Sequence, residues 1–395
     1  MKVDGSRLGQ LTYCTNIHKG ESWQETFDAL RRNVPTIHAA TAGSKPFGIG
    51  LRLSAAAAAE LSESAALEAF KRYLTETNTY VFTINGFPYG DFHSVRVKEN
   101  VYSPDWADPA RLDYSNKLAE ILAQVLPEGM DGSISTVPGT FAPWAEGRVE
   151  TITENIVQHV AHLLDVKRRT GKHVTLALEP EPCCMLETIE EAIAFFRDHL
   201  YSEAAARSLA QRASLAMDEA SAALRAHVGL CYDVCHAAIE FEDPQGSIAA
   251  LREAGIPIYK LQLSSALRFA FVGQETAELL APFNEPTYLH QVVGRGGEGL
   301  RKWPDLLPAL EEIESAAGSE WRVHFHVPVF LEDMGAFGTT QAFLREILAL
   351  HRQRPISDHL EVETYTWDVL PERYRGEPMD TAIARELNWV LGQLK

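Results

Sequence analysis

Two carboxylates follow a predicted buried strand in the segment HVTLALEPEPCC, residues 173–184. Glu179 ends the apolar run, and Glu181 comes two residues later, between Pro180 and Pro182. Proline lacks a backbone N–H, so it ends a strand's hydrogen-bond ladder and stiffens the loop that follows. Carboxylates held in this way can bind a divalent cation or transfer a proton.

Side-chain alternation predicts which way these carboxylates point. Successive side chains of a strand point to opposite faces. In VTLALE the bulky Val174, Leu176 and Leu178 share one face, and Glu179 lies on the other. Asp233 takes the equivalent place in VGLCYD. Because barrel strands turn their bulk toward the surrounding helices, we expect both carboxylates to point into the mouth of a barrel.

The same rule gathers polar groups from the other predicted strands at one mouth. They are Asn16, His18, Asn85, Glu179, Asp233, Gln262, His324, His326, Glu361 and Glu363. Carboxylates and imidazoles that converge on one cavity repel each other or stay unsatisfied without a cation. Two or three carboxylates with one imidazole suit Mn²⁺, Mg²⁺, Co²⁺ or Zn²⁺, so we predict a divalent metal cofactor. His236, three residues after Asp233, would touch substrate or a second metal.

Each of these residues also has a structural interpretation. A single polar residue at a strand end is most often a loop residue, and only the agreement of several strands favours a site. His324 fits a core histidine as well as a ligand, and Glu361 fits a deep ion pair with Lys or Arg. Glu181 fits a helix cap as well as a substrate contact. Cys231 and Cys235 are most simply small buried residues.

Strand-like runs alternate with helical stretches along the chain. The strand candidates are residues 11–16, 49–54, 80–85, 133–137, 174–179, 228–233, 258–264, 323–327 and 360–365. This alternation predicts an α/β protein with a parallel sheet, and the number of units favours a single (β/α)8 TIM-barrel domain over residues 1–395. Nine candidates compete for eight places, so either of the last two closes the barrel. Residues 186–227 predict an expanded helical crossover, and we expect extra elements at the C-terminal end.

A glycine-rich segment, HQVVGRGGEGL at residues 290–300, precedes a predicted helix. Its backbone N–H groups, with Arg295 beside them, could hold a phosphate, although a flexible loop explains the segment equally well. Neither GxSxG nor GxxxxGK[ST] occurs in the sequence. Serine-hydrolase and P-loop NTPase chemistry therefore have no support.

The charge balance restricts the partners of the chain. A net charge of −18 over 395 residues argues against nucleic acid and anionic membranes, because both are bound through Lys and Arg. The first ten residues contain no apolar region, and no run approaches the roughly 20 apolar residues of a membrane span. The five cysteines include no CxxC pair and fit reduced thiols. We expect a cytoplasmic protein, without membrane insertion, that acts on a small molecule.

The sequence resembles a known family over nearly its whole length. The motifs that carry the resemblance are LTYCTNIHKGESW, FGIGLRLS, TINGFPYGDFH, VKENVYSPDW, SISTVPG, LALEPEPCC, CYDVCHAA, LQLSSAL, HFHVPVF and EVETYTW. They are similar to those of the EboE metabolite traffic proteins, within the xylose isomerase-like superfamily. That superfamily holds sugar and sugar-phosphate isomerases and epimerases, and relatives of endonuclease IV.

The resemblance implies a divalent metal held by Glu, Asp, His and Glu. Glu179 and Asp233 match the first two ligands, and His236 matches the substrate-side histidine of the Asp-x-x-His motif. Gln262 stands where the epimerases have the ligating histidine.

Two ligands of this set stay open. Either Gln262 ligates through its amide oxygen, or His290, His324 or His326 supplies the imidazole. We choose His326 as the imidazole and Glu363 as the last carboxylate.

Three functions fit these residues. The first is a sugar, sugar-phosphate or cyclitol isomerase or epimerase, in which Glu179 and Glu363 move a proton by way of a metal-stabilised enediolate. Its predicted substrate-binding residues are His18, Asn85, Glu181, His236, Gln262, Arg268 and His290. The second is metal-dependent phosphoester hydrolysis of the endonuclease IV-like type. The third is a non-catalytic metabolite carrier.

The family resemblance also implies a setting for the activity. It associates the chain with gene clusters that make or export small metabolites. We therefore expect association with other products of such a cluster and consider a homo-oligomer.

Overall fold

Eight parallel strands form the central sheet of the computed structural model, which describes residues 1–4, 7–93 and 96–395. They are β1 (Gln10–Tyr13), β2 (Phe47–Arg52), β3 (Thr79–Asn85), β4 (Gly132–Thr136), β5 (Val174–Leu178), β6 (Val228–Asp233), β7 (Ile258–Leu263) and β13 (His359–Val362). Their order is β1-β13-β7-β6-β5-β4-β3-β2, and every hydrogen-bonded pair is parallel. The predicted (β/α)8 barrel is confirmed, with residues 360–365 rather than 323–327 supplying the eighth strand.

Side-chain hydroxyls complete the seam between β1 and β2. The backbone contributes one isolated parallel bridge there, between Cys14 and Gly50. Thr12 Oγ1 donates to the Gly48 carbonyl oxygen at 2.7 Å and accepts from the Gly50 N–H at 2.9 Å. These bonds satisfy backbone groups that a regular ladder would otherwise pair, so the barrel is nearly closed.

Gly50 is the tightest point of this seam, and its replacement is expected to destabilise the fold. A Cβ atom there would lie 2.6 Å from the Tyr13 carbonyl oxygen and would overlap the Glu361 carboxylate. We expect Gly50→Ala to lower the free energy of unfolding by about 2 kcal/mol, as overpacking does. Urea unfolding measures this loss. Gly297→Ala, where a Cβ meets nothing within 4 Å, is the control, and equal stability of the two variants would contradict the expectation.

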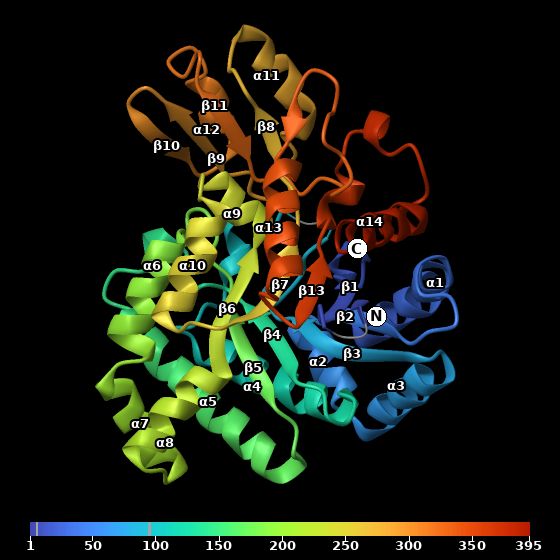
Figure 1. Ribbon diagram of the computed structural model, residues 1–395, viewed down its shortest axis with the longest axis vertical. Coiled ribbons are helices and arrows are strands. Elements are labelled where there is room, and N and C mark those ends of the chain that lie inside the picture. Colours follow the sequence, from blue (N-terminus) through green and yellow to red (C-terminus); the bar gives the residue numbers. More distant parts are fainter. Residues whose placement is uncertain (5–6, 94–95) are drawn as a thin grey trace.

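Helices cover the outside of the barrel (Figure 1). They are α1 (Trp23–Thr41), α2 (Ala55–Leu61), α3 (Ser64–Glu76), α4 (Pro109–Val125), α5 (Val149–Thr170), α6 (Ile189–Phe195), α7 (Glu203–Ala213), α8 (Met217–His227), α9 (Val234–Ile239), α10 (Pro244–Ala254), α13 (Gln341–Gln353) and α14 (Met379–Gln393). The expanded crossover of residues 186–227 contains α6, α7 and α8, as predicted. Among the described residues, none of the helices is both long enough and apolar enough to span a bilayer.

A second sheet is inserted between β7 and β13, at the top of the view in Figure 1. Its five antiparallel strands are β8 (Leu267–Phe269), β9 (Val292–Gly296), β10 (Gly299–Trp303), β11 (Glu320–Val323) and β12 (Gly338–Thr339), with the short helices α11 (Gln274–Leu280) and α12 (Leu306–Glu311). Of the strand candidate at residues 323–327, only Val323 belongs to this sheet, as the last residue of β11, and residues 324–327 lie outside any strand. The glycine-rich segment forms the β9–β10 hairpin rather than a loop before a helix, which corrects that prediction.

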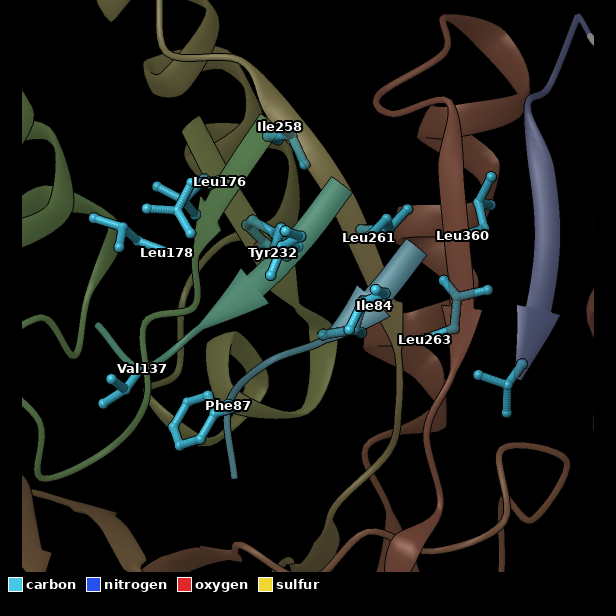
Figure 2. Close-up of a cluster of buried hydrophobic side chains, with 14 of the residues drawn as sticks. Ile84, Phe87, Val137, Leu176, Leu178, Tyr232, Ile258, Leu261, Leu263 and Leu360 are labelled. Atoms are coloured by element: carbon cyan, nitrogen blue, oxygen red, sulfur yellow. The ribbon is translucent and has the colours of Figure 1, made fainter. Parts of the chain in front are cut away.

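The two faces of the barrel strands differ as the alternation predicted. The outer face is apolar, and Leu176, Tyr232 and Leu261 pack under the helices in the buried cluster of Figure 2. The inner face is polar: Ser133 Oγ contacts Thr83 Oγ1 at 2.9 Å and His359 Nδ1 at 2.7 Å. Inward-pointing polar residues therefore fill the lumen in layers below the mouth.

The C-terminal helix α14 carries a buried carboxyl group that should make stability depend on pH. Glu386 Oε1 accepts from the Val329 N–H at 3.0 Å and from Thr364 Oγ1 at 2.6 Å. Burial raises the pKa of Glu386 from 4.5 to about 7, and the nearby charge of Glu377 adds to the rise. The folded state thus favours the neutral carboxyl group.

This raised pKa fixes the sign of the pH effect. Stability from the neutral form of Glu386 is fully present below pH 4.5 and is lost as pH rises toward about 7. The loss amounts to about 3 kcal/mol. Glu386→Gln should therefore be more stable than wild type at pH 8 and similar at pH 4.5. Urea unfolding of both proteins at pH 4.5 and at pH 8 tests this. A stability difference between Glu386→Gln and wild type that is the same at the two pH values would contradict it.

Candidate active site

A cavity that encloses about 530 Å³ of empty space, counted together with the solvent at its open mouth, lies at the carboxyl ends of the barrel strands. Its acidic floor comes from residues that follow barrel strands, and its upper wall comes from loops and from the inserted sheet. The polar lining residues are Asn16, Asn85, Lys98, Glu179, Glu181, His236, His324, His326 and Glu363. Active sites of this barrel class lie at the same end of the strands.

Three carboxylates meet at the floor of the cavity. Glu179 follows β5, Asp233 ends β6 and Glu363 follows β13, and one oxygen from each lies within 4.8 Å of the other two. All three side chains are buried. Burial, reinforced by the neighbouring carboxylates, raises the pKa of Glu179 and of Glu363 above the ordinary value. Three carboxylates packed this closely must either take up protons or bind a cation.

Hydrogen bonds hold the carboxylates of Glu363 and Asp233 in place, while one oxygen each of Asp233 and Glu179 makes no hydrogen bond to the described residues. Glu363 Oε1 accepts from Asn16 Nδ2 at 2.7 Å and from Asn85 Nδ2 at 2.9 Å. Asp233 Oδ1 caps α9 by accepting from the Cys235 N–H at 2.7 Å, and it also accepts a bond from Ser264 Oγ. Among the described residues, Asp233 Oδ2 and Glu179 Oε2 have no hydrogen-bond partner. These orphaned oxygens are what a cation would use.

Three imidazoles border the carboxylates. His236 belongs to α9, and His324 and His326 lie in the extended segment that follows β11. His236 and His326 each bring a ring nitrogen within 4.8 Å of an Asp233 oxygen. His324 and His326 therefore come from the insertion between β7 and β13 and not from a barrel strand.

A buried ion pair lies beneath the floor. Lys260 Nζ contacts Glu361 Oε1 at 2.6 Å, and neither side chain is exposed. Lys260 also donates to Ser135 Oγ at 3.2 Å. The alternative in which Glu361 pairs with a basic residue is thus confirmed. Gln262, next to Glu361 in register and fully buried, points into the same layer.

Four predicted substrate-binding residues, His18, Gln262, Arg268 and His290, lie outside the cavity lining. His18 contacts the Tyr13 hydroxyl at 2.9 Å and packs below α1. Arg268, on β8, pairs with Glu320 at 2.8 Å in the inserted sheet. His290 lies behind His324 and bonds to its carbonyl oxygen at 2.9 Å. Asn85, Glu181 and His236 face the cavity, and Asp233 contributes to the carboxylate group although it is not itself a lining residue.

An aromatic wall completes the cavity and was not predicted from the sequence. It consists of Phe87, Phe92, Tyr102, Tyr288 and Tyr365. The Tyr102 hydroxyl donates to Glu181 Oε1 at 2.8 Å, which fixes that carboxylate. The wall residues lie in loops and in the short 3₁₀ helices 98–102 and 365–368, so a rule based on strand ends does not find them. Phe87, Phe92, Tyr102 and Tyr365 fall within the motifs TINGFPYGDFH, VKENVYSPDW and EVETYTW, whereas Tyr288 lies in none of the motifs named above.

No protein-family model matches the chain, and no curated protein is significantly similar to it in sequence. Several solved structures share its general shape. One is a probable 3-DHS dehydratase, AsbF, from Bacillus anthracis, with 14% identity, coverage of 96% of this chain and 97% of that one, and a TM-score of 0.46. Another is the IolI protein with a bound zinc atom, with 13% identity, 98% coverage of both chains and a TM-score of 0.47. A third is L-ribulose 3-epimerase, with 12% identity, coverage of 98% and 94%, and a TM-score of 0.47.

Likeness at this level carries no information about the activity of the present chain. The function therefore has to be argued from the site itself.

Proposed function

We propose that the chain is a metal-dependent isomerase or epimerase of a small polyhydroxylated carbonyl compound, a sugar or a cyclitol. The observation that carries the proposal is the group of three buried carboxylates at one cavity floor, two of which have orphaned oxygens. Glu179, Asp233 and Glu363 would hold Mn²⁺, Co²⁺, Zn²⁺ or Mg²⁺, with His326 as the predicted imidazole. When bound, the metal supplies Lewis-acid polarisation of substrate oxygens.

The chain's own residues would move the proton. Glu179 and Glu363 follow barrel strands that are not neighbours, so a substrate above the floor can meet both carboxylates. One takes a proton from the carbon next to the carbonyl, and the other returns it. Asn16 and Asn85 hold Glu363 in place. His236, at the edge of the floor, can accept a hydrogen bond from a substrate hydroxyl.

The cavity favours an uncharged substrate. Lys98 is the only Lys or Arg among the described lining residues, and its ammonium group already contacts Asp305 Oδ2 at 2.7 Å. The aromatic wall offers apolar faces against which the C–H groups of a ring can pack. A free sugar or cyclitol therefore fits this cavity better than its phosphate.

The cellular setting rests on the sequence motifs alone. We propose an EboE-like role in small-metabolite biosynthesis or export in the cytoplasm, as a single-domain chain. Homo-oligomer formation and association with other products of such a gene cluster belong to the same proposal. Co-purification from cells that express the cluster tests it.

A second candidate function is metal-assisted phosphoester hydrolysis. The observation in its favour is the set of additional imidazoles beside the carboxylates, since hydrolases of this kind use more than one metal ion. The paired state of Lys98 counts against it, because no described lining residue then offers a free positive charge to a phosphate.

Proton exchange with solvent tests the first candidate. Metal-loaded protein would be incubated in D₂O with unphosphorylated ketoses and cyclitol ketones, and deuterium in the recovered compounds would be measured by mass spectrometry. We expect incorporation next to the carbonyl with at least one compound, and its loss in Glu363→Gln. Arg268→Ala, outside the cavity, should keep it. Hydrolysis of bis(p-nitrophenyl) phosphate without any exchange would move the assignment to the second candidate.

A further inference from the structure

The cavity above the carboxylate floor has a second, apolar part. Four aliphatic residues, Pro88, Val97, Val101 and Leu289, line it together with the aromatic wall. They belong to the segment after β3 and to the segment before β9. Apart from Lys98, the polar lining residues follow barrel strands, lie in α9 or follow β11. A ligand in this cavity therefore contacts two surfaces of opposite chemistry.

The hydroxyl groups of two wall tyrosines are already committed. The Tyr102 hydroxyl donates its proton to Glu181 Oε1 at 2.8 Å. Tyr288 Oη lies 3.1 Å from His93 Nδ1, and His93 Nε2 lies 2.7 Å from the Asn16 carbonyl oxygen. Burial lowers the pKa of His93 from 6.5 to about 4, so this ring is neutral at pH 7.

The direction of these hydrogen bonds follows from the acceptors. A carbonyl oxygen only accepts, so His93 Nε2 carries the single ring proton and His93 Nδ1 accepts from the Tyr288 hydroxyl. Tyr102 and Tyr288 therefore present ring carbons, and no hydroxyl proton, to a ligand.

Contacts between its two segments hold the wall in shape. The rings of Phe92, Tyr288 and Tyr365 form a triangle in which the ring centroids are 5.1 to 5.3 Å apart. The Val97 N–H donates to the Thr287 carbonyl oxygen at 2.8 Å and so joins the segment after β3 to the segment before β9. The apolar surface is therefore preformed, and a ligand spends little binding free energy on ordering it.

A bare polyol would use this apolar surface poorly. Each hydroxyl that moves from water to a carbon surface loses hydrogen bonds, which lowers affinity unless a new partner is found. Lys98 Nζ already contacts Asp305 Oδ2 at 2.7 Å and the Glu285 carbonyl oxygen at 3.4 Å. Partners for hydroxyls are therefore concentrated at the floor, and a group that lies against the wall binds best when it is apolar.

We propose that the substrate carries an apolar substituent, an aryl or branched alkyl group, on the end remote from its carbonyl group. The polyhydroxylated end lies over Glu179 and Glu363, and the substituent packs against the aromatic wall, Val101 and Leu289. Rings of this kind pack favourably against apolar and aromatic groups. The inference rests on the proposed function for the polar end, and it adds a specificity determinant that the floor does not supply.

Paired ligands that differ only in the substituent test this inference. Fructose, psicose, tagatose and sorbose, all in the D form, would each be prepared as a benzyl ether and as a methyl ether at the terminal hydroxyl remote from the carbonyl. Isothermal titration calorimetry would measure their binding to the metal-loaded protein. We expect at least one benzyl ether to bind about ten- to a hundredfold more tightly than its methyl partner, as burial of one phenyl ring predicts.

A matched pair of variants locates the preference. Leu289→Asn places an amide of similar size at a half-buried wall position. It should reduce the benzyl preference by about fivefold or more and leave methyl-ether binding unchanged, because the amide would meet the phenyl ring without a hydrogen-bond partner. Leu300→Asn makes the same change at an exposed leucine of the β9–β10 hairpin and should keep the preference. Val101→Asn replaces Leu289→Asn if circular dichroism shows that the latter is not folded.

The outcomes separate this inference from the proposed function. Equal affinity for the two members of every pair, including no detectable binding of either, would overturn the inference, and so would a preference that survives in the wall variant. Deuterium exchange on the same ligands reports the proposed function independently. A benzyl preference without exchange supports the apolar site and removes the isomerase assignment. Exchange without a preference supports the isomerase assignment and removes the apolar substituent.

Discussion

Replacing Glu179 by Gln should abolish the proposed proton transfer and, at the same time, stabilise the metal-free protein. Glu179, Asp233 and Glu363 lie within 4.8 Å of one another in a buried layer. Removing one negative charge relieves both the repulsion and the burial of an ion. We expect about 1–3 kcal/mol of added stability, the trade often seen between an active site and the fold that carries it.

The expected loss of exchange rate in Glu179→Gln can be compared with the usual contribution of catalytic acids and bases. Positioned acids and bases contribute about 10²–10⁴-fold to rates, so the exchange rate should fall by that factor or more. Urea unfolding in excess chelator measures the stability change. Glu298→Gln, an exposed carboxylate in the β9–β10 hairpin, is the control and should change neither quantity. A metal-free Glu179→Gln protein that is less stable than wild type would contradict the electrostatic account.

The second large effect concerns the ion pair beneath the floor. Lys260 and Glu361 are completely buried and 2.6 Å apart. Removal of one partner leaves an uncompensated charge in the core, which typically destabilises a protein by about 3–5 kcal/mol. Lys260→Met should therefore lose that much stability, measured by urea unfolding at neutral pH.

A double variant separates the ion pair from simple packing. Lys260→Met with Glu361→Gln removes both charges and keeps the side chains similar in size, so most of the lost stability should return. A double variant as unstable as Lys260→Met would show that the lysine acts through its shape rather than its charge. Lys260 also lowers the pKa of Glu179 and Glu363, so its loss should weaken metal binding as well.

The acidic floor could be predicted because it depends on local sequence. The alternation in VTLALE and VGLCYD decides the face of Glu179 and Asp233, and the two prolines mark where the first strand ends. Barrel geometry then brings strand ends together without further information. Glu363 follows the same rule once residues 360–365 are recognised as the eighth strand.

The rest of the site depends on tertiary placement that spacing does not encode. The strand rule placed His324 and His326 at the mouth, and both line the cavity, but they follow β11 of the inserted sheet and not a barrel strand. Arg268 belongs to the same insertion, where it forms an ion pair with Glu320 and does not line the cavity. His18 turns toward α1 because the chain bends after β1, so its nearness to a strand end was misleading.

Metal content tests the central claim most directly. Elemental mass spectrometry would be applied to wild type, Glu179→Gln and Asp233→Asn after reconstitution with Mn²⁺, Co²⁺ or Zn²⁺. The account predicts that wild type holds at least one equivalent more than either variant. Wild type that binds no divalent metal after reconstitution, with its fold intact, would contradict the account.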